Sequence, residues 1–291
     1  MKRYAILPAA IMVATLLPVT LAGQEVGPSN GALVIAGGAV RDEAIIQRFL
    51  DLAGGAHAPI VVIPTAGGAE DYDQFYQGLK QFRDQGATRL TVLHTKDPAV
   101  ANTDAFVQPI RDANGVWFSG GRQWRLADAY LGTKTEEELW NLLKRGGVIG
   151  GSSAGATIQG SYLVRGDTRT NTIMMGDHEE GFGFLKNTAI DQHLLKRNRQ
   201  FDLIEVIEAQ PQLLGIGLDE NTAIVVQSDR FEVIGQSYIA VYDNRKMIGE
   251  TGRFYFLAPG DRYNLATREA VRAQRNMRPL GRVEERQWPE R

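Results

Sequence analysis

A serine flanked by glycines lies in the segment VIGGSSAGATIQG. Gly151, Ser153 and Gly155 form a Gly-x-Ser-x-Gly pattern, which permits a tight turn from a strand into a helix and raises the serine hydroxyl above the end of a sheet. Ser152 does not fit the pattern, because the residue two positions after it is alanine. Free N–H groups and the positive dipole end of the following helix would favour an oxyanion beside Ser153. The pattern favours Ser153 as a nucleophile; the structural alternative is a glycine-rich turn in which both serines cap the helix.

A serine hydroxyl is a weak nucleophile at neutral pH and needs a base, normally a histidine that an acid orients. His193, in IDQHLLKRNRQ, is the candidate base, and we expect it to begin a helix; a capping or buried structural histidine is the alternative. Asp219 and Glu220, in LGIGLDENTAIVV, are candidate acids, because they stand where one strand should end and the next begin. Of the other three histidines, His57 lies in a Gly/Ala loop, His94 at the end of an expected strand and His178 in an acidic loop. No second histidine lies at helical spacing from the last of these, so a metal site there is disfavoured.

Elements that could position these residues alternate along the first half of the chain. Short β-branched runs predict buried strands in residues 32–38, 59–68, 89–95, 115–121 and 146–151. The i, i+3, i+4 spacing of apolar residues predicts helices in DEAIIQRFLDLA and DYDQFYQGLKQFRDQG. Alternation of strand and helix predicts a parallel sheet with helices on both faces.

The pattern changes after Gly160. Residues 191–207 are expected to be helical once past the first few. Four closely spaced strand candidates then follow, LLGIGL, TAIVVQ, RFEVIG and SYIAVYD, and these predict antiparallel hairpins at the edge of the sheet.

The amino terminus has the pattern of a secretory signal. Lys2 and Arg3 precede an almost uncharged run over residues 4–21, and Thr20 and Ala22 fit the small residues before a cleavage site. We expect cleavage after Ala22 and a secreted or periplasmic protein with no stable membrane span after cleavage. A buried helix or an uncleaved anchor is the alternative.

The chain therefore divides into a signal peptide in residues 1–22 and a single domain in residues 23–291, with its core at about 31–265. No linker rich in Pro, Gly or Ser and no internal repeat divides the domain. The Arg-rich tail over 267–291 is expected to be a solvated or frayed helix.

Composition excludes several functions. The chain is 43% hydrophobic and 23% charged, as soluble globular proteins are. It has no cysteine, which excludes disulfides, thiolate metal sites and a cysteine nucleophile. Without Lys2 and Arg3, 30 of the 32 basic residues face 34 acidic ones, and this negative balance disfavours a nucleic-acid partner. No Gly-x-Gly-x-x-Gly or Gly-x-x-x-x-Gly-Lys pattern points to a nucleotide cofactor.

Four blocks together resemble a known family. WFSGGRQWRL, GGSSAGA, IDQHLLKRNR and LGIGLDENTAIVV, in this order and at these separations, are similar to cyanophycinase and its relatives, the serine peptidases that include dipeptidase E. The similarity runs from ALVIAGG to about Leu257. It implies a class I glutamine amidotransferase-like (flavodoxin-like) α/β sandwich in which serine replaces the usual cysteine.

The resemblance assigns roles to individual residues. It implies that Ser153 is the nucleophile, His193 the general base and acid, and Glu220 the orienting carboxylate. An oxyanion hole would use the backbone N–H of Ala154 and one near Gly121. It implies no metal or cofactor. The substrate pocket would be lined by Gln123, Asp191, Gln192, Arg197 and Arg199.

Two residues depart from the family pattern. Arg122 stands where an acid or amide is usual, and Asp202 stands where the family tends to continue a cluster of arginines. On a helix, Asp202 and Arg199 would lie on the same side and could pair, which would lower the positive potential of the pocket. Otherwise Asp202 would face the pocket and accept a guanidinium of the substrate.

The resemblance therefore implies a secreted serine peptidase that hydrolyses aspartyl or β-aspartyl bonds, with a cyanophycin-like polymer of aspartate and arginine as its substrate. The alternatives are an aspartyl or isoaspartyl dipeptidase acting on short peptides and, from another class, a non-catalytic binding protein on the same fold. An amidotransferase needs a cysteine and is excluded. Family members are often dimers, so a homodimer is one expectation.

Overall fold

The structure of the chain is a computed structural model that describes residues 25–245 and 252–274. The predicted signal peptide and most of the Arg-rich tail lie outside the described residues. Within those two ranges, no helix is both long and apolar enough to cross a membrane.

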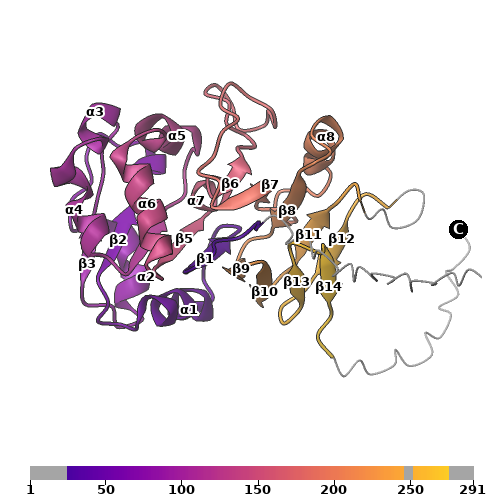
Figure 1. Ribbon diagram of the computed structural model, residues 1–291, viewed down its shortest axis with the longest axis horizontal. Helices are drawn as coiled ribbons and strands as arrows, with labels where there is room; N and C mark the ends of the chain where they lie inside the picture. Colours follow the sequence, from indigo (N-terminus) through magenta and orange to yellow (C-terminus); the bar gives the residue numbers. More distant parts are fainter. Residues whose placement is uncertain (1–24, 246–251, 275–291) are drawn as a thin grey trace, which may run out of the picture.

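The larger sheet has nine strands in the order β14-β13-β10-β9-β1-β5-β4-β2-β3 (Figure 1). One part is parallel, as predicted. It consists of β1 (Ala32–Ala36), β5 (Val148–Ser152), β4 (Gly115–Phe118), β2 (Ile60–Ile63) and β3 (Leu90–Val92). Antiparallel strands extend it beyond β1: β9 (Thr222–Gln227), β10 (Arg230–Gly235), β13 (Arg262–Asn264) and β14 (Glu269–Val271). The start of the tail is thus a strand and not the expected helix.

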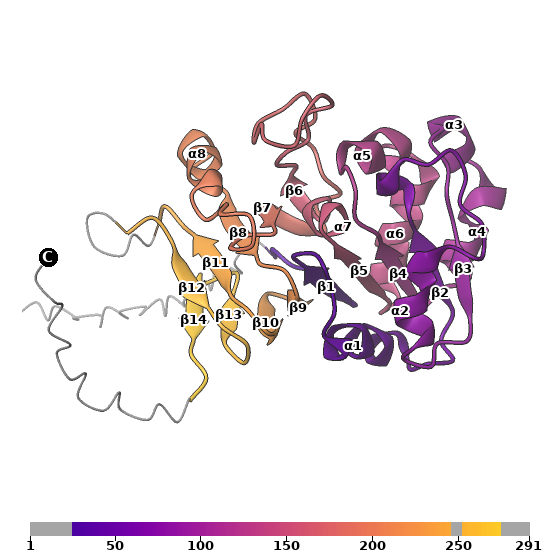
Figure 2. The same cartoon turned by 180° about the vertical axis from the view of Figure 1, so that it is seen from behind.

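A second sheet of five strands was not predicted. Its order is β12-β11-β8-β7-β6. The strands are β6 (Gly160–Tyr162), β7 (Leu185–Gln192), β8 (Leu214–Leu218), β11 (Ile239–Tyr242) and β12 (Tyr255–Leu257). The four strand candidates after residue 212 therefore do not share one edge: β9 and β10 join the large sheet, whereas β8 and β11 pair in the second. Figure 2 shows the antiparallel strands at one end of the molecule and β2 and β3 at the other.

Helices connect the parallel strands. They are α1 (Glu43–Ala53), α2 (Lys80–Arg83), α3 (Pro98–Ala101), α4 (Asp104–Asp112), α5 (Trp124–Tyr130), α6 (Lys134–Lys144), α7 (Ala154–Thr157) and α8 (Asp202–Ala209), with 3₁₀ turns η1 (Thr65–Gly67) and η2 (Gln77–Leu79). In α1, the Asp42 side chain accepts from the Ala44 N–H, and Gly54, with a φ of 103°, ends the helix.

Two expected helices are wrong in part. In residues 71–86, the Gln74 side chain accepts from the N–H of Val92 and donates to its carbonyl, which ties this stretch to the edge strand β3. The stretch is helical only in η2 and α2. After β7 the chain makes turns up to residue 201 and is helical only in α8. His193 therefore follows a strand directly and does not begin a helix.

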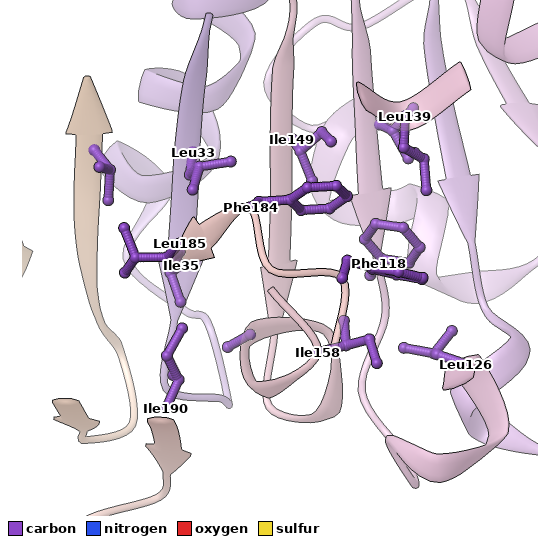
Figure 3. Packing of buried hydrophobic residues seen from close by; sticks show 14 of the residues in the cluster. Leu33, Ile35, Phe118, Leu126, Leu139, Ile149, Ile158, Phe184, Leu185 and Ile190 are labelled. Carbon is purple, nitrogen blue, oxygen red and sulfur yellow. The ribbon is translucent and has the colours of Figure 1, made fainter. Parts of the chain in front are cut away.

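Apolar side chains fill both faces of the large sheet. Leu33 and Ile35 of β1 point to one face, where they belong to a core that includes residues of α5, α6 and β7 (Figure 3). Val34 points to the other face, towards α1. There the ring of Phe49 of α1 packs edge to face on Trp117 of β4, with 5.1 Å between the ring centroids. The structure confirms the predicted α/β fold, with helices on both faces and antiparallel strands added after the parallel ones.

Candidate active site

A sharp turn joins β5 to α7 at Ser153. Its φ of 56° and ψ of −115° lie outside the regions that most residues adopt. The turn needs both flanking glycines, because a β-carbon at Gly151 would lie 2.3 Å from the Gly155 carbonyl oxygen, and one at Gly155 would lie 2.1 Å from that of Phe118. This is the elbow that the Gly-x-Ser-x-Gly pattern predicts.

Three polar side chains form a chain of hydrogen bonds at this turn. The Ser153 Oγ lies 2.9 Å from the His193 Nε2, and the His193 Nδ1 lies 2.7 Å from the Glu220 Oε1. Each residue comes just after the carboxyl end of a strand: β5, β7 and β8. The structure thus brings together the three residues expected to act as nucleophile, base and acid. Asp219 instead faces the turn after His193, where its Oδ1 accepts from the N–H groups of Leu195 and Lys196.

The turn after β1 holds the three segments together. The Ala36 carbonyl accepts from the Ser153 N–H, the Gly37 carbonyl from the His193 N–H, and the Gly38 carbonyl from the N–H of residue 221, at 2.8–3.0 Å. A β-carbon at Gly38 would lie 2.4 Å from the His193 Cε1. The glycine pair at the end of ALVIAGG is the sequence signal for this support.

Burial lowers the pKa of His193 below its ordinary value of 6.5, and the positive charges of Arg197 and Arg199 act in the same direction. The hydrogen bond to Glu220 opposes this shift. The imidazole is therefore neutral at neutral pH. With Nδ1–H donating to Glu220, its Nε2 is free to accept the proton of the Ser153 hydroxyl.

Two backbone N–H groups lie in the segments beside Ser153. Gly120 packs against the serine, since a β-carbon there would lie 3.2 Å from the Ser153 Cβ. In the part of the chain that the structure describes, the N–H groups of Gly121 and Ala154 have no hydrogen-bond acceptor. They are therefore free to donate to an oxyanion, and their role in stabilising one stays a prediction.

A pocket of about 550 Å³ opens next to the turn that follows His193. Arg199 is only 7% exposed, and its Nη1 donates to the Gln192 carbonyl and side chain at 3.2 and 3.0 Å. Among the described residues, no carboxylate lies within ion-pair distance of Arg199 or Arg197. Both guanidinium groups are therefore available to an anionic ligand. The lining residues are Arg165, Thr172, Met174, Arg197, Arg199, Phe201, Asp202 and Glu205.

Three residues expected in the pocket wall lie behind it. Gln123 is 1% exposed, and its Nε2 donates to the carbonyls of Val164 and Arg165 at 2.8 and 2.9 Å. Asp191 is fully buried against Arg165, and Gln192 is 4% exposed. The three side chains are buried and do not line the pocket, and they support the residues that do.

Of the two alternatives for Asp202, the structure shows the residue on the pocket and not paired with Arg199. Arg199 precedes the first turn of α8, where its carbonyl accepts from the Asp202 N–H, and the Asp202 carboxylate pairs with Arg165 at 2.5 Å. Sequence reasoning missed Arg165, which lies 37 residues earlier. The other departure from the pattern, Arg122, anchors the loop between β6 and β7, because its Nη2 donates to the Asp167 carbonyl at 2.6 Å.

The remaining histidines bond elsewhere: His57 to Thr88, His94 to Thr65, and His178 to Asp128 and Asp177. Within the described ranges, no cluster of three or more His, Asp or Glu residues is arranged to hold a metal ion.

Comparison with known proteins agrees with the family that the four blocks indicate. The model of peptidase family S51 matches residues 32–234. The chain belongs to this family. This S51 peptidase is 30% identical to the cyanophycinase of Geminocystis herdmanii over 265 residues, which cover 83% of this chain and 96% of the relative. It is 30% identical to the cyanophycinase of Synechococcus elongatus over 274 residues, covering 87% and 84%.

A solved structure supports the fold. The peptidase of an acI-B1 Actinobacterium superposes with a TM-score of 0.64 at 24% identity, covering 82% of this chain and 98% of its own. Membership of the family makes the chain a hydrolase that cleaves peptide bonds.

Proposed function

We propose that this S51 peptidase hydrolyses aspartyl or β-aspartyl bonds through Ser153, His193 and Glu220. The observation that carries the proposal is the hydrogen-bond chain of 2.9 and 2.7 Å between these side chains, together with a neighbouring pocket in which the buried Arg199 has no carboxylate within ion-pair distance among the described residues. The spacing suits a serine nucleophile, its base and an orienting acid.

The reaction proceeds through an acyl-enzyme. The Ser153 Oγ attacks the scissile carbonyl carbon while its proton passes to the His193 Nε2. The negative oxygen of the tetrahedral intermediate accepts from the N–H groups of Ala154 and Gly121. The C–N bond breaks as His193 returns its proton to the leaving amine. Water, deprotonated by His193, then attacks the ester, and the proton returns to Ser153 as the acid product leaves.

The charges of the pocket support an acidic residue at the scissile bond. The Arg199 guanidinium is buried, and a buried positive charge needs an anion to balance it. A carboxylate can accept hydrogen bonds from two of its N–H groups at once. Glu205, on the same pocket, is suited to a cationic side chain such as that of arginine, whereas Asp202 is paired with Arg165. A β-aspartyl-arginine unit offers both groups, and the curated relatives are named cyanophycinases. A cyanophycin-like polymer is therefore the substrate that we propose.

Mass spectrometry of the products tests this specificity. Purified protein would be incubated with cyanophycin and with a panel of Asp-Xaa and β-Asp-Xaa peptides, together with matched peptides that carry the amide in place of the acidic side chain. We expect cleavage of the acidic members, and Arg199→Met should lower their kcat/KM by about 10- to 100-fold, the scale of a hydrogen bond between charged groups. Equal losses on acidic and amide peptides would contradict the role of Arg199. Cleavage of short peptides alone would indicate a dipeptidase. Absence of any cleavage, together with no labelling by a fluorophosphonate probe, would indicate a binding protein.

The pH profile tests the base. Only neutral His193 accepts the serine proton, so kcat/KM should fall as the pH drops through its pKa, and burial places this acidic limb below pH 6.5. Arg197→Gln removes a positive charge that lowers this pKa, so the limb should move to higher pH. A limb that stays in place in this variant would assign the titration to another group.

We also propose secretion or export to the periplasm after cleavage following Ala22. Amino-terminal sequencing of the exported protein should start at Gly23, and a start at Met1 would contradict cleavage. The homodimer stays a prediction that the solution mass would test.

A further inference from the structure

One buried arginine lies between two carboxylates at the back of the pocket. The Arg165 side chain is 2% exposed, and its Nε and Nη2 donate to the two oxygens of Asp191, each at 2.8 Å. The same Nη2 donates to Asp202 at 2.5 Å, and Nη1 donates to the Asn171 carbonyl at 2.9 Å. One positive charge thus holds two negative side chains from β7 and α8.

The backbone of Arg165 is fixed as firmly as its side chain. Its φ is 56°, its N–H donates to the Met174 carbonyl, and its own carbonyl accepts from Gln123. Arg165 therefore connects the loop after β6 to Gln123, which follows β4 in the chain. Through Asp191 it also connects this loop to the end of β7. His193 stands only two residues beyond Asp191.

Arg199 lies within the field of these charges. Arg165, Arg199 and Asp202 line the same pocket, and the Gln192 side chain, next to Asp191, accepts from Arg199. Burial lowers the pKa of Arg199, and the positive charge of Arg165 lowers it further, whereas the negative charges of Asp191 and Asp202 raise it. Without Arg165, both carboxylates would be left to pair with the nearest cation.

We propose that Arg165 is a positioning residue that sets substrate specificity: it holds Asp191 and Asp202 to itself and so keeps Arg199 available to bind the acidic group of the substrate. This rests on the proposed function of the pocket. The charges predict that loosening Arg165 and neutralising Asp202 have opposite effects on the preference for acidic substrates. A residue that served only to keep the fold stable would not separate the two.

Two variants test the proposal through the ratio of kcat/KM on an acidic peptide to that on its amide counterpart. Arg165→Lys keeps the charge but loses the fork that holds both carboxylates, so the ratio should fall about tenfold, mainly through KM on the acidic peptide. Asp202→Asn leaves the Arg165–Asp191 pair intact and removes a negative charge from the pocket. Its ratio should rise about threefold, the scale of a half-exposed charge pair.

The matched control is Arg169→Gln. It removes a positive charge from the same loop, but its side chain is 81% exposed, so the ratio should stay within about twofold of the wild type. The rate of fluorophosphonate labelling would report on the Ser153–His193 pair without any substrate. If Arg165→Lys does not fold, Asp202→Asn decides, because its side chain is 37% exposed and tolerates the change.

The outcomes separate the two proposals. A wild type that does not distinguish acidic from amide peptides overturns the proposed specificity and this inference together. A wild type that does distinguish them, with ratios unchanged in Arg165→Lys and Asp202→Asn, overturns only the role of Arg165. Opposite shifts in the two variants support it.

Discussion

Replacing Ser153 by alanine is expected to lower kcat by about 10³- to 10⁶-fold and to abolish labelling by a fluorophosphonate probe. The side chain loses only the oxygen that lies 2.9 Å from the His193 Nε2, so the β-carbon and the packing of the turn are kept. Steady-state kinetics on a β-aspartyl peptide measures the loss, and an unchanged thermal unfolding midpoint would show that the variant folds.

The matched control is Ser152→Ala. Ser152 ends β5 one residue earlier, and among the described contacts its hydroxyl takes no part in the chain of hydrogen bonds. We expect it to lose less than about tenfold in kcat. Equal or reversed losses in the two variants would show that Ser153 is not the nucleophile.

The elbow was predictable because its causes are local. A β-carbon at Gly151 would meet the Gly155 carbonyl oxygen only four residues later, and a pattern of five residues records that need. Only the contact of Gly155 with Phe118 of β4 comes from a distant segment. The parallel strands were predictable for a similar reason: strands buried on both faces have continuous apolar runs, as in β1 and β2.

The acid could not be chosen from the residues alone. Asp219 and Glu220 are adjacent, and both follow β8. Only the path of the chain decides that Glu220 reaches His193, whereas Asp219 binds the turn after it and the Ser237 hydroxyl. The family resemblance pointed to Glu220 because it compares the whole block rather than the local pattern.

Contacts between distant segments explain what the sequence did not predict. Arg165 meets Asp202 across 37 residues, so helical spacing suggested the wrong partner for Asp202. The support of His193 by Gly37 and Gly38 spans more than 150 residues of chain. The second sheet also escaped prediction, since a strand pattern does not say which neighbour a strand pairs with.

The last prediction concerns the acid. Glu220→Gln is expected to lower kcat by about 10⁴-fold, because a neutral amide neither fixes the Nδ1–H tautomer of His193 nor stabilises the imidazolium that forms during the reaction. The change keeps the size of the side chain, so the unfolding midpoint should change little. Glu220 raises the pKa of His193, and its removal should therefore move the acidic limb of the residual activity to still lower pH.

Asp219→Asn provides the comparison at the adjacent position. An asparagine oxygen can still accept from the N–H groups of Leu195 and Lys196, which now bond the Asp219 Oδ1 at 2.9 Å, and its amide can donate to the Ser237 hydroxyl. We therefore expect a loss of less than about tenfold, without a shift of the acidic limb. Full activity in Glu220→Gln together with a large loss in Asp219→Asn would transfer the orienting role to Asp219. That result would require the turn after His193 to rearrange, because the Asp219 carboxylate would have to leave its two backbone partners to reach the imidazole.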